Sequence, residues 1–130
     1  MTFDAIGIAG SALTVHRKWL DSISDNLANV NTATSTDGAA FQARYVIAEA
    51  GEGNTGVYVK GAAYGDAEGR LVYEPAHPLA DAEGYVRYPD IDLASQMSSL
   101  IMAQRGYQAN AALVDRAKSS YEAALQIGRN

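Results

Sequence analysis

The sequence contains no cysteine, and among its 130 residues there are only two histidines, three prolines and one tryptophan. Without cysteine the chain can form no disulfide and perform no thiol chemistry, although this absence does not identify its compartment. A zinc site needs three or four ligands with short spacing, which two separated histidines do not supply. We therefore expect no metal and no cofactor.

A basic leader, a long apolar run and a basic patch are also lacking. The first ten residues carry no lysine or arginine and only a short apolar stretch, so we expect no cleavable secretory signal. No run is long enough for a membrane-spanning helix. The net charge is −5, and lysines and arginines form no stripe suited to nucleic acid or an anionic membrane. We expect neither a nucleic-acid partner nor a direct membrane span.

The composition is that of a folded protein, with 48% hydrophobic and 19% charged residues. A chain of this length fits one compact domain or a small domain with long helical extensions. The acidic excess lies in the middle, where residues 33–89 hold eight acidic and four basic side chains. An extended chain this short buries little surface, so we expect partner subunits to complete its core.

Apolar residues near the N-terminus repeat every seven positions, which predicts an amphipathic helix. One series is Ile6, Leu13, Leu20 and Leu27, and the series three positions later is Ala9, His16, Ile23 and Val30. Two such series form a coiled-coil-like seam over four heptads. Asparagines in the segment 29–32 tolerate the left-handed conformation at a helix end. We assign residues 1–36 to this N-terminal helical part.

The C-terminal part, residues 91–130, also predicts one long helix, which Asp92 can cap and Gly128 can end. The first apolar series is Leu93, Leu100, Tyr107, Val114 and Tyr121, and the series four positions later is Met97, Gln104, Ala111, Lys118 and Leu125. Three positions after members of the first series lie Ala103, Ala117 and Ala124. Ile101 and Met102 add apolar surface beside this seam, which is more than one partner helix covers. Gly106 in mid-helix costs about 1 kcal/mol relative to alanine, so we expect either a neighbour to pack there or the helix to deform there.

The central part, residues 37–90, predicts short strands at 41–48, 57–59, 70–73 and 85–88, rich in valine and tyrosine and bounded by glycine or proline. The sequence Asp-Ala-Glu-Gly occurs at 66–69 and again at 81–84. We interpret both copies as turns whose glycine has a positive φ. The predicted fold is α+β: two long terminal helices pair as a coiled-coil-like hairpin, with a small central β-hairpin domain.

Motifs that could indicate an active site have simpler explanations. Residues 51–56 match G-x-G-x-x-G, but strand-like residues follow where a dinucleotide loop needs a helix, and Glu52 would repel phosphate. We expect a glycine-rich hairpin connection there. His16 lies on the helical seam, and His77 lies between Pro75 and Pro78. No nucleophile or acid–base arrangement is recognisable, so we expect no enzyme.

Two motifs at opposite ends resemble a known family. Ser24-x-Asn26-Leu27-Ala28-Asn29-x-Asn31-Thr32, with Ser11-Ala12-Leu13 upstream, resembles the N-terminal signature of flagellar rod, hook and hook-associated proteins. Asp92-Leu93-x-x-x-Met97 and the segment 104–110 resemble the closing helix of that family. Residues 73–89 resemble a proximal rod member of it. The loop 33–41 departs from the family because it lacks the usual glycine pair, proline and basic residues, and residues 48–56 are short.

The resemblance implies a structural subunit of the bacterial flagellar basal-body rod, assembling through its terminal helices into the torque-transmitting drive shaft. It implies as partners copies of the chain, other rod subunits, the flagellar type III export apparatus and the membrane ring at the rod base. The location would be the basal body in the cell envelope and periplasmic space, reached without a cleaved signal. A secreted coiled-coil binding or adaptor module, or another rod or hook member, remains the alternative.

The residues that we expect at the assembly interface come from both motifs and both seams. They are Leu13, Leu20, Ser24, Asn26, Leu27, Asn29, Thr32, Leu93, Met97, Leu100, Gln104, Arg105, Tyr107, Asn110, Val114 and Tyr121.

Overall fold

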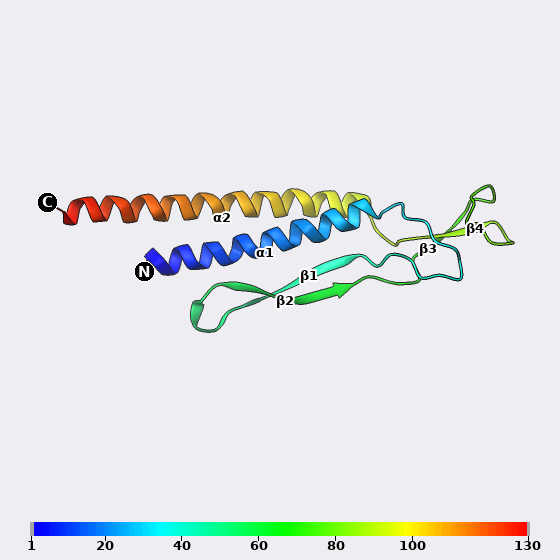
Figure 1. The fold of residues 1–130 in the computed structure, drawn as a ribbon, viewed down its shortest axis with the longest axis horizontal. Coiled ribbons are helices and arrows are strands. Elements are labelled where there is room, and N and C mark those ends of the chain that lie inside the picture. Colours follow the sequence, from blue (N-terminus) through cyan, green and yellow to red (C-terminus); the bar gives the residue numbers. More distant parts are fainter. Residues whose placement is uncertain (1, 130) are drawn as a thin grey trace. The chain divides into compact units, whose positions relative to one another are not determined.

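The computed structural model describes residues 2–129 and, among them, the side chains from residue 4 onward. Residues 1 and 130, the outer limits of the predicted terminal parts, lie outside the described residues. The elements in chain order are α1 (Thr2–Ala28), β1 (Arg44–Ala50), the short 3-10 helix η1 (Glu52–Asn54), β2 (Val57–Tyr64), β3 (Arg70–Tyr73), β4 (Tyr85–Tyr88) and α2 (Leu93–Gly128) (Figure 1). This arrangement confirms the predicted α+β class, with two terminal helices and a central β region.

The element boundaries follow the local sequence with two exceptions. Strands β3 and β4 occupy the predicted residues, and α2 begins directly after Asp92, whose Oδ1 accepts the Ala94 N–H at 3.0 Å. Strand β1 begins three residues later than predicted, and β2 continues to Tyr64 instead of ending at residue 59. The added part of β2 contains glycine and two alanines, which have low strand propensity, so pairing with β1 rather than local preference extends it.

The described chain forms two compact units. The first comprises residues 2–20, 46–61 and 101–129, and the second comprises residues 21–45 and 62–100. Each helix therefore contributes to both units. In the described chain β1 lies beside β2 in one two-stranded sheet, and β3 pairs with β4 in an antiparallel two-stranded sheet.

In the first unit, His16 of α1 packs on Gly106 of α2. The imidazole Nδ1 lies 2.7 Å from the Ala12 carbonyl oxygen and donates a hydrogen bond to it, which fixes the ring against its own helix. A Cβ built on Gly106 would lie only 2.2 Å from the His16 Nε2 atom. Glycine is required because the ring occupies the space of a side chain, and this confirms the expectation that a neighbour packs there.

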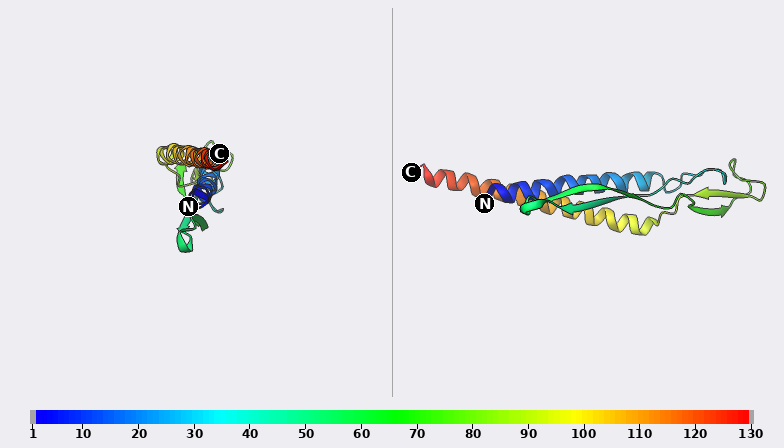
Figure 2. Two further views of the ribbon diagram at one scale, coloured as in Figure 1. Left: turned by 90° about the vertical axis from the view of Figure 1, so that its left-hand side faces the viewer. Right: turned by 90° about the horizontal axis from the view of Figure 1, so that it is seen from below.

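The opposite side of α1 in this unit is covered by the β1–β2 hairpin (Figures 1 and 2). The Val57 N–H donates to Ser11 Oγ at 3.0 Å, and that hydroxyl donates to the Ile8 carbonyl at 2.7 Å. Gly56 has φ +121°, and a Cβ there would lie 2.2 Å from Ser11 Oγ. Val15 is buried as well. Helix α1 is thus covered on two sides, by α2 and by the β1–β2 hairpin, whereas its heptad pattern predicts only one buried side.

The G-x-G-x-x-G segment connects β1 to β2, as the sequence predicted. The Gly51 N–H donates to the Gly56 carbonyl at 2.7 Å and closes the loop. Gly53 and Asn54 both have positive φ, at 62° and 58°. The next element is the strand β2, so the loop does not open a helix as a dinucleotide-binding loop would.

The second unit contains the β3–β4 ribbon, in which Arg70 lies opposite Tyr88 and Tyr73 opposite Tyr85. The two Asp-Ala-Glu-Gly segments form the expected turns, with φ +60° at Gly69 and +87° at Gly84. The Asp81 carboxylate accepts the N–H groups of Tyr85 at 2.9 Å and Glu83 at 3.0 Å. The Tyr85 N–H is the main cause of the lowered pKa of Asp81.

Residues 33–41, the loop after α1, are fastened to β4 in the same unit. Thr34 and Arg87 exchange two backbone hydrogen bonds of 2.8 and 3.0 Å. The Arg87 guanidinium donates to the Thr36 carbonyl at 2.7 Å and to the Glu68 carbonyl. Val86, next to this arginine, is completely buried. One arginine therefore holds the loop, the first turn and β4 together.

The Gly106 contact generates a stability prediction. Gly106→Ala should gain about 1 kcal/mol of helix propensity but lose about 1–3 kcal/mol through overpacking against His16, a net destabilisation. Gly7→Ala is the matched control, since nothing lies within 4 Å of a Cβ at that position in α1, and it should stabilise by up to about 1 kcal/mol. Urea unfolding followed by circular dichroism measures both. Equal stabilisation by the two changes would contradict the packing described.

Candidate assembly surfaces on the two helices

The signature residue Asn26 is buried in the second unit, with 1% of its surface exposed. Its Nδ2 donates to the Arg44 carbonyl at 2.9 Å, and its Oδ1 accepts the Arg44 N–H at 2.8 Å. The same Nδ2 donates to Gln96 Oε1 at 3.1 Å. Because Arg44 supplies both a donor and an acceptor, only one orientation of the amide satisfies all three bonds. Asn26 thereby joins α1, β1 and α2.

The remaining polar residues of the signature terminate α1. Asn29 Nδ2 donates to the Asp25 carbonyl at 2.8 Å, and Thr32 Oγ1 donates to Asn29 Oδ1 at 3.1 Å. The last carbonyl groups of a helix have no N–H partner within the helix, and the Asn29 side chain supplies a donor there. The Asp25–Arg44 ion pair at 3.2 Å is about half exposed, so it contributes little by itself. The signature therefore builds a corner between the helix and the β region.

The sequence left open which seven-residue series of α2 packs on α1. In the first series Leu100, Tyr107, Val114 and Tyr121 are half-buried and Leu93 is exposed. In the series four positions later only Ala111 is half-buried, and Met97, Gln104, Lys118 and Leu125 are exposed. The residues that complete the buried face are Gln96, Ala103, Asn110 and Ala117. They are small or polar, so they allow closer approach of the helices, and Ala103 is fully buried.

Each unit contains a contact that joins the two helices. In the first unit His16 of α1 contacts Gly106 of α2, and in the second unit Asn26 of α1 bonds Gln96 of α2.

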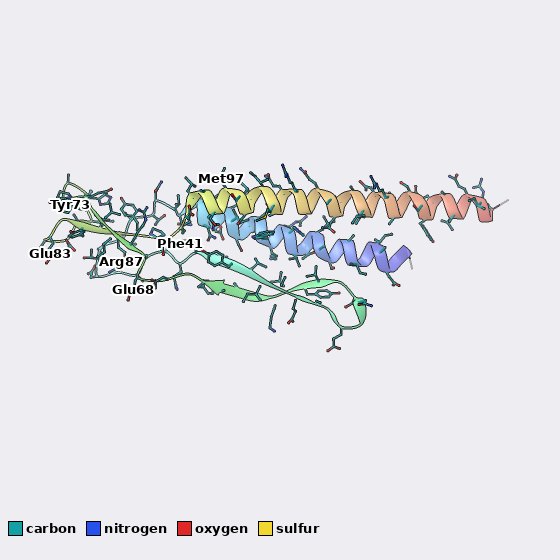
Figure 3. The ribbon with its side chains drawn as sticks, turned by 180° about the vertical axis from the view of Figure 1, so that it is seen from behind. Phe41, Glu68, Tyr73, Glu83, Arg87 and Met97 are labelled. Carbon is teal, nitrogen blue, oxygen red and sulfur yellow. The ribbon has the colours of Figure 1, made fainter. Side chains whose placement is uncertain are left out.

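A row of large apolar side chains on α2 stays exposed after this packing. We call Leu93, Met97 and Ile101 the outer stripe, because their spacing of four residues places them along one side of the helix. Their exposed fractions are 53%, 46% and 49%. Met97 lies on the outward side of α2 in Figure 3. Exposed apolar rows of this kind mark protein contacts.

The sixteen residues expected at the interface fall into two groups. Ser24, Thr32, Leu93, Met97, Gln104 and Arg105 are exposed. Leu13, Leu20, Asn26, Leu27, Asn29, Leu100, Tyr107, Asn110, Val114 and Tyr121 are buried or half-buried within the chain.

Three polar residues with structural roles were not recognised as such from the sequence. Ser11 bonds the β1–β2 hairpin, Gln96 bonds Asn26, and Ser22 is buried with 5% exposure. Gln96 repeats at seven-residue spacing with Ala103, and this spacing could have identified it. Ser11 bonds a backbone N–H distant in sequence, for which the sequence carries no signal.

Residues 2–129 contain no group of three or more histidine, aspartate or glutamate side chains placed to hold a metal ion. Within the same described stretch, neither helix has the length and apolarity to cross a membrane.

Comparison with known proteins identifies relatives over nearly the whole chain. The family described as flagellar basal body rod FlgEFG protein C-terminal matches residues 82–127. The flagellar basal-body rod protein FlgC of Salmonella typhimurium strain LT2 is 39% identical over 126 residues, covering 94% of each chain. FlgC of Bacillus subtilis strain 168 is 31% identical, covering 98% of each chain, and FlgC of Borreliella burgdorferi is 31% identical, covering 96% of each.

The chain belongs to the family of flagellar basal-body rod proteins, which are structural proteins. Within this class, its full-length similarity is to the rod protein FlgC of distantly related bacteria.

The Asn26 network yields a testable prediction. Asn26→Asp keeps the shape but replaces the amide donor with a carboxylate oxygen that faces the Arg44 carbonyl and Gln96 Oε1, so a buried charge keeps only the bond from the Arg44 N–H. We expect a loss of about 3 kcal/mol or more in unfolding free energy. Asn31→Asp, at an exposed position of the same motif, should change stability by less than about 0.5 kcal/mol. Chemical denaturation compares the two, and similar losses would refute the role assigned to Asn26.

Proposed function

We propose that this rod protein assembles by packing the exposed faces of its two helices against copies of itself and against other rod subunits. The single observation that carries the proposal is the outer stripe. Leu93, Met97 and Ile101 are about half exposed although the helix that bears them is already paired with α1. Burying apolar surface stabilises by roughly 25 cal/mol per Å², so neighbouring helices would cover this stripe in an assembly.

The expected interface residues then take two roles. The exposed group, which includes Met97, Gln104 and Arg105, contacts neighbouring subunits. The buried group, which includes Asn26 and Leu100, holds α1 on α2 and so gives the exposed group a fixed arrangement. In the same proposal residues 1–36 and 91–130 act as the assembling helices, and residues 37–90 form the β-rich part.

Stiffness supports a role in transmitting torque. The helix pair is held by close packing at Gly106 and by buried hydrogen bonds at Asn26. Rigid, close-packed interiors transmit strain. A shaft built from such pairs would turn as one body, which suits the torque-transmitting drive shaft of the flagellum.

The finer assignments rest on the resemblance of the motifs to the proximal rod. They place the chain near the base of the rod beside the membrane ring, in the basal body within the cell envelope and periplasmic space. The flagellar type III export apparatus would carry it there without removal of a signal peptide. The neutral, amphipathic character of α1 is compatible with this route.

A structural role without catalysis is supported by the uses of the polar residues. The glycine-rich segment 51–56 closes a hairpin, His16 fills the helix interface, and Asp81 holds a turn. These three features, which could indicate chemistry in the sequence, each have a packing or turn-forming role in the fold.

Met97→Glu tests the proposal in a strain in which this chain replaces the native flgC product or is restored to its own deletion background. Met97 is already exposed, so the variant should fold, as circular dichroism can verify. The added charge should prevent neighbouring helices from covering the outer stripe and so abolish rod assembly and swimming. Ser95→Glu, at an exposed position on another side of the same helix turn, should swim normally.

A motile Met97→Glu strain with intact rods would show that the outer stripe is not an assembly surface. A deletion strain that swims with a complete rod would remove the functional assignment as a whole.

A further inference from the structure

The β3–β4 ribbon has one covered face and one exposed face. Side chains alternate between the faces of a strand, and the register places Leu71, Tyr73, Tyr85 and Arg87 on the same face. The Arg87 guanidinium is held by the Thr36 and Glu68 carbonyls, and we call the other three residues, Leu71, Tyr73 and Tyr85, the tyrosine face. Their exposed fractions are 54%, 63% and 37%, whereas Val86 on the other face is completely buried. A two-stranded ribbon is marginal alone and gains stability when a helix packs on its open face.

The two tyrosines are arranged as an anchor for such a contact. Their ring centroids lie 5.4 Å apart in an edge-to-face geometry, so each ring restricts the other. Tyrosine is enriched among the residues that contribute most to protein interfaces, because a large rigid side chain loses little entropy on binding. Leu71 extends the same apolar area along β3.

Acidic side chains stand at both ends of the tyrosine face. The Asp-Ala-Glu-Gly turns precede β3 and β4, and because these strands are antiparallel the turns lie at opposite ends of the ribbon. Glu68 and Glu83 are labelled at these positions in Figure 3. Asp66 and Asp81 are occupied by turn hydrogen bonds. Within residues 2–129 the carboxylates of Glu68 and Glu83 have no ion-pair partner.

The chain itself carries a surface that complements this pattern. We define the arginine face as the exposed residues of α2 at alternating spacings of three and four, together with the adjacent Leu113. Its members are Met102, Arg105, Ala109, Ala112, Leu113 and Arg116. Met102 and Leu113 are 55% and 54% exposed. Neither guanidinium has an ion-pair partner within the described part of the chain.

The spacing of the charges agrees as well. Arg105 and Arg116 are eleven residues apart, which is about 16 Å along a helix and returns to nearly the same side of it. The four-residue ribbon is about 13 Å long, and the glutamates lie just beyond its two ends. A helix laid along the ribbon can therefore bring one arginine to each glutamate, with apolar residues between.

We propose that the tyrosine face of one copy docks on the arginine face of helix α2 of a second copy. The inference rests on the proposed function, because it requires copies to lie side by side in the rod. The two faces are different surfaces of one chain, so the contact is head-to-tail. Head-to-tail contacts generate closed rings or open helical arrays rather than two-fold pairs, and either arrangement can surround the axis of a rod.

The absence of cysteine makes a site-specific crosslinking test possible. Two purified full-length chains are mixed, one with Ala82→Cys beside Glu83 and one with Ala109→Cys at the centre of the arginine face, and treated with a short bismaleimide. Both alanines are exposed, so the changes preserve the docking residues. The yield of the Ala82–Ala109 product should be about fivefold higher than that of a control pair. In the control pair, Ala62→Cys, at an exposed alanine on β2, is mixed with the same Ala109→Cys chain.

Charge reversal decides whether the ion pairs guide the contact. The double change Glu68→Arg and Glu83→Arg is made on the Ala82→Cys chain. It should lower the yield of the Ala82–Ala109 crosslinked product about tenfold. Adding Arg105→Glu and Arg116→Glu to the Ala109→Cys chain should restore it. A yield equal to that of the Ala62 control, no effect of reversal, or crosslinking between two Ala82→Cys chains in place of the expected product would overturn the proposal.

This result is independent of the motility test. A chain that restores swimming but fails to crosslink removes the docking proposal and leaves the proposed function intact. A chain that crosslinks as expected but cannot restore swimming supports the contact and counts against the proposed function.

Discussion

The incomplete coverage of α2 is the constraint on which the function of this protein depends. Helix α1 covers one side of α2 through the half-buried Leu100, Tyr107 and Val114 and the buried Ala103. The outer stripe and the arginine face remain in solvent. A monomer gains nothing from exposed apolar residues in these positions, whereas an assembled subunit does. In the assembly that we propose, the folding of the single chain and the construction of the rod use different sides of the same helix.

The signature of the family acquires a physical explanation from this arrangement. Asn26 is buried and bonded to the backbone of β1 and to a side chain of α2, while Asn29 and Thr32 end the helix. The buried amide of Asn26 makes three hydrogen bonds within the chain. This part of the signature thus shapes the subunit itself.

The heptads of α1, the two Asp-Ala-Glu-Gly turns and the limits of β3, β4 and α2 could be predicted from the sequence, because each depends on local periodicity or turn chemistry. The inner face of α2 could not be chosen from the sequence. The residues three positions after the first series include Ala103 and Ala117, those four positions after it include Met97 and Leu125, and the sequence pattern does not distinguish between them. Packing selects Ala103 and Ala117, since small residues allow the backbones to approach.

The packing of the β1–β2 hairpin on α1 could not be predicted from the sequence for a different reason. It depends on Ser11 meeting the backbone of Val57, 46 positions away, and a backbone N–H has no sequence signature. The same holds for Arg87, whose position in a strand gave no sign that it fastens the loop at Thr34 and Thr36. The candidate interface residues were predicted as one set because a seam within a chain and a seam between chains have the same seven-residue pattern.

The contact between His16 and Gly106 has a mechanical consequence. A heptad pattern looks the same after a shift of seven residues, so two long helices under a twisting load could slip past each other by one repeat. Such a slip would place the imidazole opposite Ser99 or Leu113, neither of which leaves room for it. Within the described part of α2, Gly106 is the one glycine on the face that packs on α1. A close contact that exists at one position only fixes the register of α1 on α2 within the first unit.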